Sequence, residues 1–250
     1  VYDYSPYYFN RHAQGPSFDG DPPNNEQGLI AGSEYKDKKN RIFFNVKKAR
    51  SGVSEWKLSG ASTSPEEPAV DKSFYGEYVL KVSRKLEIYY RYLFASEEKY
   101  MDIDDSDLYD YRQVEQNKEK HRYQITLKKR KTRFRMRYDE NSINVKEKSF
   151  KERRGIIWGE LKRDVSDFCD VSFRAIFFGR GDILMNIYEP YWGSVYGSNV
   201  LGYSAGTRYY LTTRFKLKNG LFLWAKYGRT EYEEGKKIIN DCRLQLDYVL

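Results

Sequence analysis

Basic side chains recur at alternate positions in two parts of the chain, and this spacing is the clearest sign of chemistry in the sequence. Arg133, Arg135 and Arg137 occupy every second residue. Successive side chains of a β-strand point to opposite faces, so such a run places its cations on one face. A wall of this kind attracts anions such as phosphates, lipopolysaccharide or nucleic acid. The first patch is Arg122, Lys128, Arg133, Arg135 and Arg137, and the second is Arg208, Arg214 and Lys216.

The same cations also have a purely structural interpretation. Buried charges generally require partners, and we expect Glu87, Glu160 and Asp247 to be the carboxylates that neutralise them. In that case the polar face is a network of ion pairs and not a path for anions. The sequence leaves both interpretations open.

Catalytic and metal-binding patterns are weak. The two histidines, His12 and His121, are far apart, and the sequence has no nucleophile elbow, phosphate-binding loop or dinucleotide-binding glycine pattern. We therefore expect no enzymatic activity, no metal site and no cofactor. The acidic residues of segment 95–120 have no spacing that suits a calcium loop, so a solvated acidic loop is expected. They are Asp102, Asp104, Asp105, Asp107 and Asp110.

The elements that carry these side chains have a period of two. In 86–94, for example, Leu86, Ile88 and Tyr90 alternate with Glu87 and Tyr89. Alternation of apolar and polar residues predicts β-strands with two different faces. Eleven strands are predicted, at 28–35, 41–48, 73–82, 86–94, 121–128, 133–138, 155–162, 168–178, 207–217, 221–229 and 242–250.

The composition suits strands that lie between lipid and water. Mean hydropathy is −0.83 and the net charge is +8, yet 17% of the residues are aromatic, including 24 tyrosines. No apolar run approaches the ~20 residues of a transmembrane helix. Low hydropathy with many aromatics is typical of transmembrane β-barrels, in which alternate residues face lipid and water. A soluble β-sandwich or lipocalin-like barrel, whose strands also alternate, remains the other interpretation.

Connections of alternating length support the membrane interpretation. Short turns are predicted at 37–40, 83–85, 129–131, 163–167 and 218–220, and outer-membrane barrels have such turns on their periplasmic side and long loops outside. Counting back from a descending last strand, 1–27 is the end of a preceding strand plus an extracellular loop, so the chain is expected to start inside a larger barrel. Residues 182–190 are expected to form a ribbon beyond the bilayer. The barrel domain is 28–250, with long loops at 51–72, 95–120, 140–152, 179–206 and 230–238.

Aromatic residues near strand ends predict the girdle that such barrels place at the two membrane surfaces. The ordinary preference of aromatics for strands explains any single one of them equally well. The girdle candidates are Tyr35, Tyr92, Tyr138, Tyr209, Tyr227 and Tyr248.

Several stretches resemble one family of bacterial outer-membrane proteins. They include NNEQGLIAGSEYK at 24–36, RRGIIWGELK at 153–162, GTRYYLTTRFK at 206–216 and LFLWAKYGRTEY at 221–232. The chain is similar to the C-terminal outer-membrane β-barrel of proteins whose periplasmic half carries helix-hairpin-helix repeats. The resemblance implies a Gram-negative outer-membrane location, and it implies that the chain is a fragment without the helix-hairpin-helix half.

The sequence thus predicts an all-β, antiparallel up-and-down transmembrane β-barrel of about eleven or twelve strands, part of a larger barrel. Its expected function is that of a porin-like channel or transport component with a basic lumen, coupled to DNA through the missing module. A non-conducting anchor and a soluble ligand-binding barrel are the alternatives. Expected partners are outer-membrane lipid, the barrel-assembly machinery and an anionic solute or DNA.

Overall fold

The structure of the chain is a computed structural model. It describes residues 2–3, 26–51, 70–102, 111–146, 149–181, 183, 185–189, 197–201, 204–217 and 220–248. The elements are β1 (Tyr2–Asp3), β2 (Glu26–Lys36), β3 (Asn40–Ser51), β4 (Val70–Lys81), β5 (Leu86–Asp102), β6 (Tyr111–Lys129), β7 (Thr132–Val145), β8 (Phe150–Ser166), β9 (Cys169–Phe178), β10 (Met185–Glu189), β11 (Gly197–Leu201), β12 (Gly206–Lys216), β13 (Leu221–Tyr232), a 3-10 turn η1 (Glu234–Lys236) and β14 (Ile238–Tyr248).

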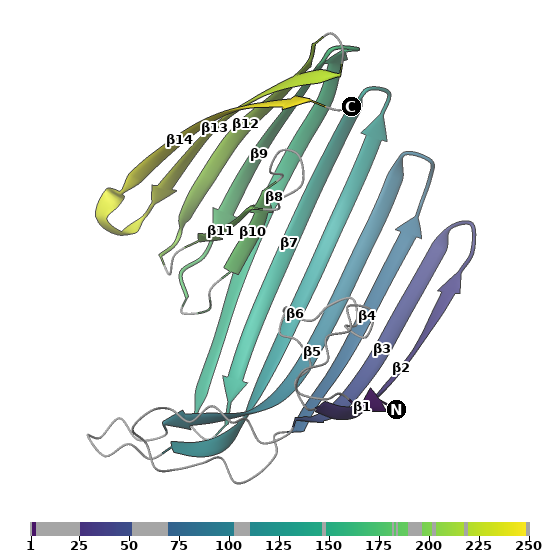
Figure 1. Ribbon diagram of the computed structural model, residues 1–250, viewed down its shortest axis with the longest axis vertical. Coiled ribbons are helices and arrows are strands. Elements are labelled where there is room, and N and C mark those ends of the chain that lie inside the picture. The colour runs from purple at the N-terminus through teal and green to yellow at the C-terminus, as the bar shows by residue number, and fades with distance from the viewer. Residues whose placement is uncertain are drawn as a thin grey trace.

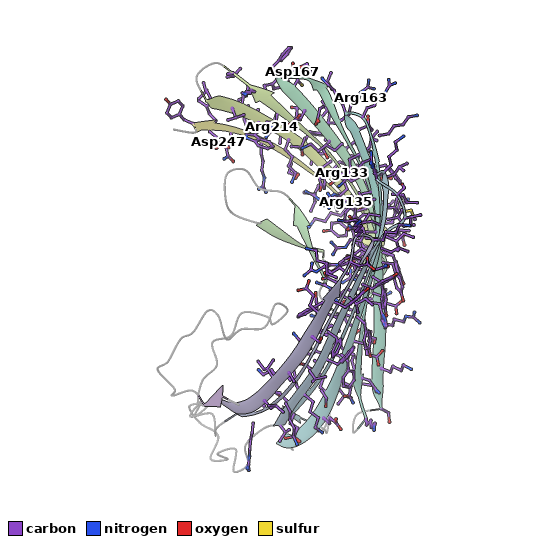
Figure 2. The ribbon with its side chains drawn as sticks, turned by 90° about the vertical axis from the view of Figure 1, so that its right-hand side faces the viewer. Arg133, Arg135, Arg163, Asp167, Arg214 and Asp247 are labelled. Atoms are coloured by element: carbon purple, nitrogen blue, oxygen red, sulfur yellow. The ribbon has the colours of Figure 1, made fainter. Side chains whose placement is uncertain are left out.

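The main sheet is a single antiparallel layer of 12 strands. Each strand lies beside its neighbour in sequence, except that β9 is followed in the sheet by β12. The sheet curves strongly, and Figure 2 shows it from the side as a crescent. The sheet is not closed: β14 pairs only with β13 among the described strands. The expected up-and-down architecture is confirmed, as an open wall and not as a complete cylinder.

All eleven predicted strands are present, and a two-stranded ribbon lies within 179–206. It consists of β10 and β11, which form a separate two-stranded sheet. Figure 2 shows this ribbon on the concave side of the main sheet. The strands next to the long loops extend further than the alternation predicted. β5 and β6 pair from Leu86–Leu127 as far as Asp102–Tyr111, so much of the expected loop 95–120 is strand.

Short turns lie at one end of the strands and long connections at the other (Figure 1). At the first short turn, the carboxylate of Asp37 accepts hydrogen bonds from the backbone nitrogens of Lys39 (2.6 Å) and Asn40 (2.5 Å). An aspartate that bonds the backbone in this way stabilises a tight reversal. A strand end and an extracellular loop were predicted for residues 1–27. Of these residues the structure describes β1 and the start of β2, and residues 4–25 lie outside the described part.

The two faces of the sheet differ in character. Leu244 (74% exposed), Leu161 (48%) and Ile125 (47%) represent the convex face, on which large apolar side chains are exposed. Most of the buried polar and charged side chains, such as Glu160, Arg174 and Lys226, lie on the concave face, which is the better packed of the two. Its apolar cluster contains Ile156, Trp158, Ile176, Phe178 and Tyr210. No helix among the described residues has the length and apolar character needed to cross a bilayer.

Candidate functional site

Three arginines from two strands share one carboxylate on the concave wall. Glu160 of β8 is 4% exposed. One of its carboxylate oxygens accepts hydrogen bonds from Arg135 at 2.8 Å and Arg133 at 3.3 Å, both on β7. The other oxygen accepts two hydrogen bonds from Arg174, on β9. With three cations around one anion, this part of the wall keeps a local positive charge.

An aromatic side chain supports the same cluster. The guanidinium of Arg174 lies 4.4 Å from the ring centroid of Trp158, and those of Arg135 and Arg137 lie 5.5 Å from it. A cation over an indole face is attracted by the electrons of the ring. Arg174 also lies over Tyr210, at 5.2 Å. The rings of Trp158 and Tyr210 therefore stabilise part of the positive charge that Glu160 does not neutralise.

The remaining basic candidates find other carboxylates. Arg122 and Arg137 both bond Asp139, at 2.7 and 2.5 Å. In the second patch, Arg208 pairs with Asp241 at 2.9 Å. Arg214 pairs with Asp170, and its guanidinium lies 5.4 Å from the ring centroid of Trp224. Lys128 and Lys216 are exposed near the short-turn end of the sheet.

The structure places the basic residues of both patches on one face of the sheet, and it corrects their expected counter-ions. Glu160 is confirmed as a partner. Glu87 and Asp247 form no ion pair among the described residues, and Asp247 instead accepts a hydrogen bond from Gln245. The carboxylates that pair with the other arginines of the two patches are Asp139, Asp170 and Asp241. Alternation along a strand shows which residues share a face, but only the strand register shows which arginine lies opposite which carboxylate.

Arg154 is a concave-face residue that the sequence did not single out. It is 1% exposed. Its guanidinium donates to the backbone carbonyls of Gly179 (2.8 Å), Ile183 (2.7 Å) and Ser204 (3.4 Å). Because these carbonyls lie at both ends of the segment that carries β10 and β11, Arg154 fixes the base of that segment to the inside of β8.

Tyrosines form an ordered group on the convex face. Tyr92, Tyr138 and Tyr227 each lie six positions from the short-turn end of their strands, which begin at Leu86, Thr132 and Leu221. Six residues of strand span roughly 20 Å. Tyr35 and Tyr248 lie at the short-turn end itself, and they are 58% and 62% exposed.

Neighbouring rings in this group touch. Tyr123 lies between Tyr90 and Tyr138, with centroid distances of 5.0 and 6.3 Å. Tyr209 contacts Phe177 at 6.4 Å. The candidates whose strand positions are given above thus lie at two levels of the apolar face, and the girdle stays a prediction.

The other reactive residues do not form a site. His121 lies on the convex face, 3.2 Å from the hydroxyl of Tyr90. No group of metal-ligating side chains occurs in the described ranges. Cys169 and Cys242 are both free thiols. His12 and the aspartates at 104, 105, 107 and 110 lie outside the described residues.

Comparisons with known proteins give only structural similarities. No family model matches the chain, and no curated protein matches it. The FrpB iron transporter from Neisseria meningitidis (F3-3 variant) aligns with a TM-score of 0.49 at 9% identity, over 89% of this chain and 42% of that one. Its F5-1 variant in the apoprotein form gives 0.47 at 9% identity, over 88% and 40%.

A third similarity is to the translocator domain of the autotransporter NalP from Neisseria meningitidis. It has a TM-score of 0.30 at 12% identity, over 90% of this chain and 80% of that domain. The chain spans less than half the length of the FrpB structures. What FrpB transports and what NalP translocates are properties of those proteins.

Proposed function

We propose that this chain is part of the wall of an outer-membrane β-barrel that conducts solutes past a charged inner surface. One observation carries the proposal, namely the opposite character of the two faces. Large apolar side chains such as Leu244 and Ile125 are exposed on the convex face, while Arg135, Glu160 and Arg174 line the concave face. Apolar residues outside and charged residues inside are the arrangement of a barrel in lipid.

A soluble β-sandwich requires the reverse arrangement. In a sandwich the apolar faces of two sheets pack together and the charged faces meet solvent. Here the exposed apolar face is continuous across the sheet, from Leu29 on β2 through Phe134 on β7 to Leu246 on β14. A continuous apolar face of this extent needs a partner, and lipid is the partner that suits a single curved layer.

The open edges imply further strands. In hydrocarbon every backbone N–H and C=O must be paired within the protein, so open sheet edges do not face lipid. We propose that the free edge of β14 and the edge at β1 and β2 are closed by additional strands, as the predicted larger barrel requires.

Location in the outer membrane is tested by fractionation and by gel mobility. We expect the full-length protein to remain in the membrane fraction and to migrate faster in detergent gels before boiling than after it. Recovery in the soluble fraction without any detergent would contradict the proposal.

Conduction is tested in planar lipid bilayers. We expect stepwise ion conductance, with a reversal potential in a potassium chloride gradient that indicates preference for chloride. Replacing Arg133, Arg135 and Arg137 together by glutamine should reduce that preference. Arg153→Gln is the matched control, because Arg153 is 69% exposed and pairs with Glu140 on the other face of the sheet. Equal loss of selectivity in both variants would argue against an anion path along the concave wall.

A non-conducting anchor is the second candidate, and the bonds of Arg154 favour it. Arg154 ties the base of the ribbon segment to the inside of the wall, where such a segment obstructs passage. If this holds, wild-type protein is silent in bilayers and Arg154→Ala conducts, while Arg153→Ala stays silent. Conductance in the wild type that Arg154→Ala leaves unchanged would rule out the obstruction.

The link to DNA rests on the sequence resemblance alone. We propose that a periplasmic helix-hairpin-helix module accompanies this barrel and binds DNA through its phosphates. The barrel itself is proposed to carry no catalytic step. Binding of the full-length protein to labelled DNA, measured with and without the proposed helix-hairpin-helix module, tests the link. DNA binding that does not depend on that module would refute it.

A further inference from the structure

The register of the sheet creates a row of donors that no single strand reveals. Across six neighbouring strand pairs, Lys128 lies beside Arg133, Arg133 beside Lys162, Lys162 beside Ser172, Ser172 beside Thr212, Thr212 beside Lys226, and Lys226 beside Arg243. All seven side chains share the face of Glu160. The row contains five cations and two hydroxyls, and no carboxylate.

We propose that Lys162, Ser172, Thr212 and Lys226 in this row form a binding site for a tetrahedral oxyanion such as phosphate. This site adds a class of solute to the proposed function. It rests on that function, because it requires water on the concave face. All four side chains can donate hydrogen bonds. A tetrahedral anion presents several acceptor oxygens and so satisfies several donors at once.

The hydroxyl of Thr212 is the first sign that a ligand belongs here. Thr212 is 7% exposed, and its Oγ1 has no hydrogen-bond partner in the described structure. A buried hydroxyl without a partner costs about 1–3 kcal/mol. A bound oxyanion would remove this cost by accepting the hydroxyl proton.

Lys162 is the second sign. It is half-buried on the concave wall, and it makes no hydrogen bond or ion pair with any described residue. The carboxylates two positions away are already engaged, since Glu160 is held by Arg174 and Asp170 by Arg214. The ammonium group of Lys162 is therefore available to a diffusible anion.

The spacing suits a small anion. Directly opposed residues on adjacent strands have their Cβ atoms ~5 Å apart, so Ser172 and Thr212 present neighbouring hydroxyls. Lys162 and Lys226 flank them, three strand spacings or ~14 Å apart. Their long stems allow both ammonium groups to reach an anion above the hydroxyls. The ammonium of Lys226 lies 4.8 Å from the ring centroid of Tyr210, which precedes Thr212 by two residues on the same face.

The site is tested by measuring phosphate binding to the full-length protein in detergent. This measurement does not require the protein to conduct ions. Titration calorimetry with inorganic phosphate should give saturable binding. Sulfate should compete with phosphate for the site, and chloride should not. Lys162→Gln and Thr212→Val should each weaken binding at least tenfold. Thr213→Val and Lys81→Gln should leave it unchanged, because Thr213 lies on the convex face and Lys81 lies at the short-turn end of β4.

The outcomes separate this site from the proposed conduit. Absence of phosphate binding, or equal weakening by Lys81→Gln, overturns the site even if the protein conducts ions. Binding that needs Lys162 and Thr212 in a protein that never conducts supports the site and overturns the conduit. Binding of a DNA oligonucleotide that inorganic phosphate cannot displace overturns the assignment to a small oxyanion.

Discussion

Arg174 on β9 lies directly opposite Glu160 on β8 and donates two hydrogen bonds to one carboxylate oxygen, with both side chains almost fully buried. This pair is the centre of the charged concave wall, because Arg133 and Arg135 bond the other oxygen of the same carboxylate. The negative charge of Glu160 thus compensates cations from two neighbouring strands.

Removal of that charge should destabilise the sheet. Glu160→Gln leaves Arg174 buried without its anion, and breaking a buried ion pair costs roughly 3–5 kcal/mol. The free energy of unfolding in urea, measured in lipid vesicles, checks this. Glu87→Gln is the control, since Glu87 lies on the same face and forms no described ion pair; its cost should stay within about 0.5 kcal/mol. Equal effects would mean that the arginine cluster needs no anion.

The orientation of the faces is tested by placing arginine on each in turn. Leu244 and Gln245 are neighbours on β14, and Leu244 is exposed on the convex face. In a lipid-facing position Leu244→Arg should cost roughly 2–4 kcal/mol of unfolding free energy. Gln245→Arg, on the water-facing side near Asp247, should cost less than about 1 kcal/mol. If the convex face met water, the two variants would be equally stable.

Gly155 and Gly159 form a matched pair on β8. A Cβ at Gly155 would lie 2.9 Å from the hydroxyl oxygen of Tyr138, whereas a Cβ at Gly159 would meet nothing within 4 Å. Gly155→Ala should displace the Tyr138 ring and its hydrogen bond to Glu140, which is 2.7 Å long, at a cost of about 1–3 kcal/mol. Gly159→Ala should be neutral or slightly stabilising. Unfolding curves of both variants check this, and a stable Gly155→Ala protein would show that the ring moves freely.

The first short turn should depend on pH. Hydrogen bonds from Asn40, foremost its side chain, lower the pKa of Asp37 from 3.8 to about 2. Because the folded-state pKa is below the unfolded one, Asp37 contributes stability that is complete above pH 4 and is lost as the pH falls through about 2.

Comparison of wild type with Asp37→Ala reveals that contribution. The difference in unfolding free energy between them should shrink between pH 4 and pH 2. Asp167→Ala is the control, because Asp167 is fully exposed in another short turn, where it contacts Lys131 at 3.3 Å. A difference for Asp37→Ala that does not change with pH would show that the ionised carboxylate does not hold the turn.

The sequence by itself determined the strands and their two faces, since both depend on local alternation. Arg133, Arg135 and Arg137 had to share a face once their segment was a strand, and Tyr138 on the same strand had to lie on the other. The short turns followed from the clusters of polar residues between strands. The lengths of β5 and β6 did not follow from the sequence. Polar residues form strand as readily as loop where a neighbouring strand pairs with them.

Only the tertiary structure decided which side chains meet across strands. Asp139 as the partner of Arg122 and Arg137, the bonds of Arg154 to the ribbon segment, and the row from Lys162 to Lys226 all depend on register. Register is set by pairing between segments up to tens of residues apart, and a shift by one residue would reverse every face. Local alternation fixes which face a side chain takes, and it carries no information on the neighbour that the side chain finds there.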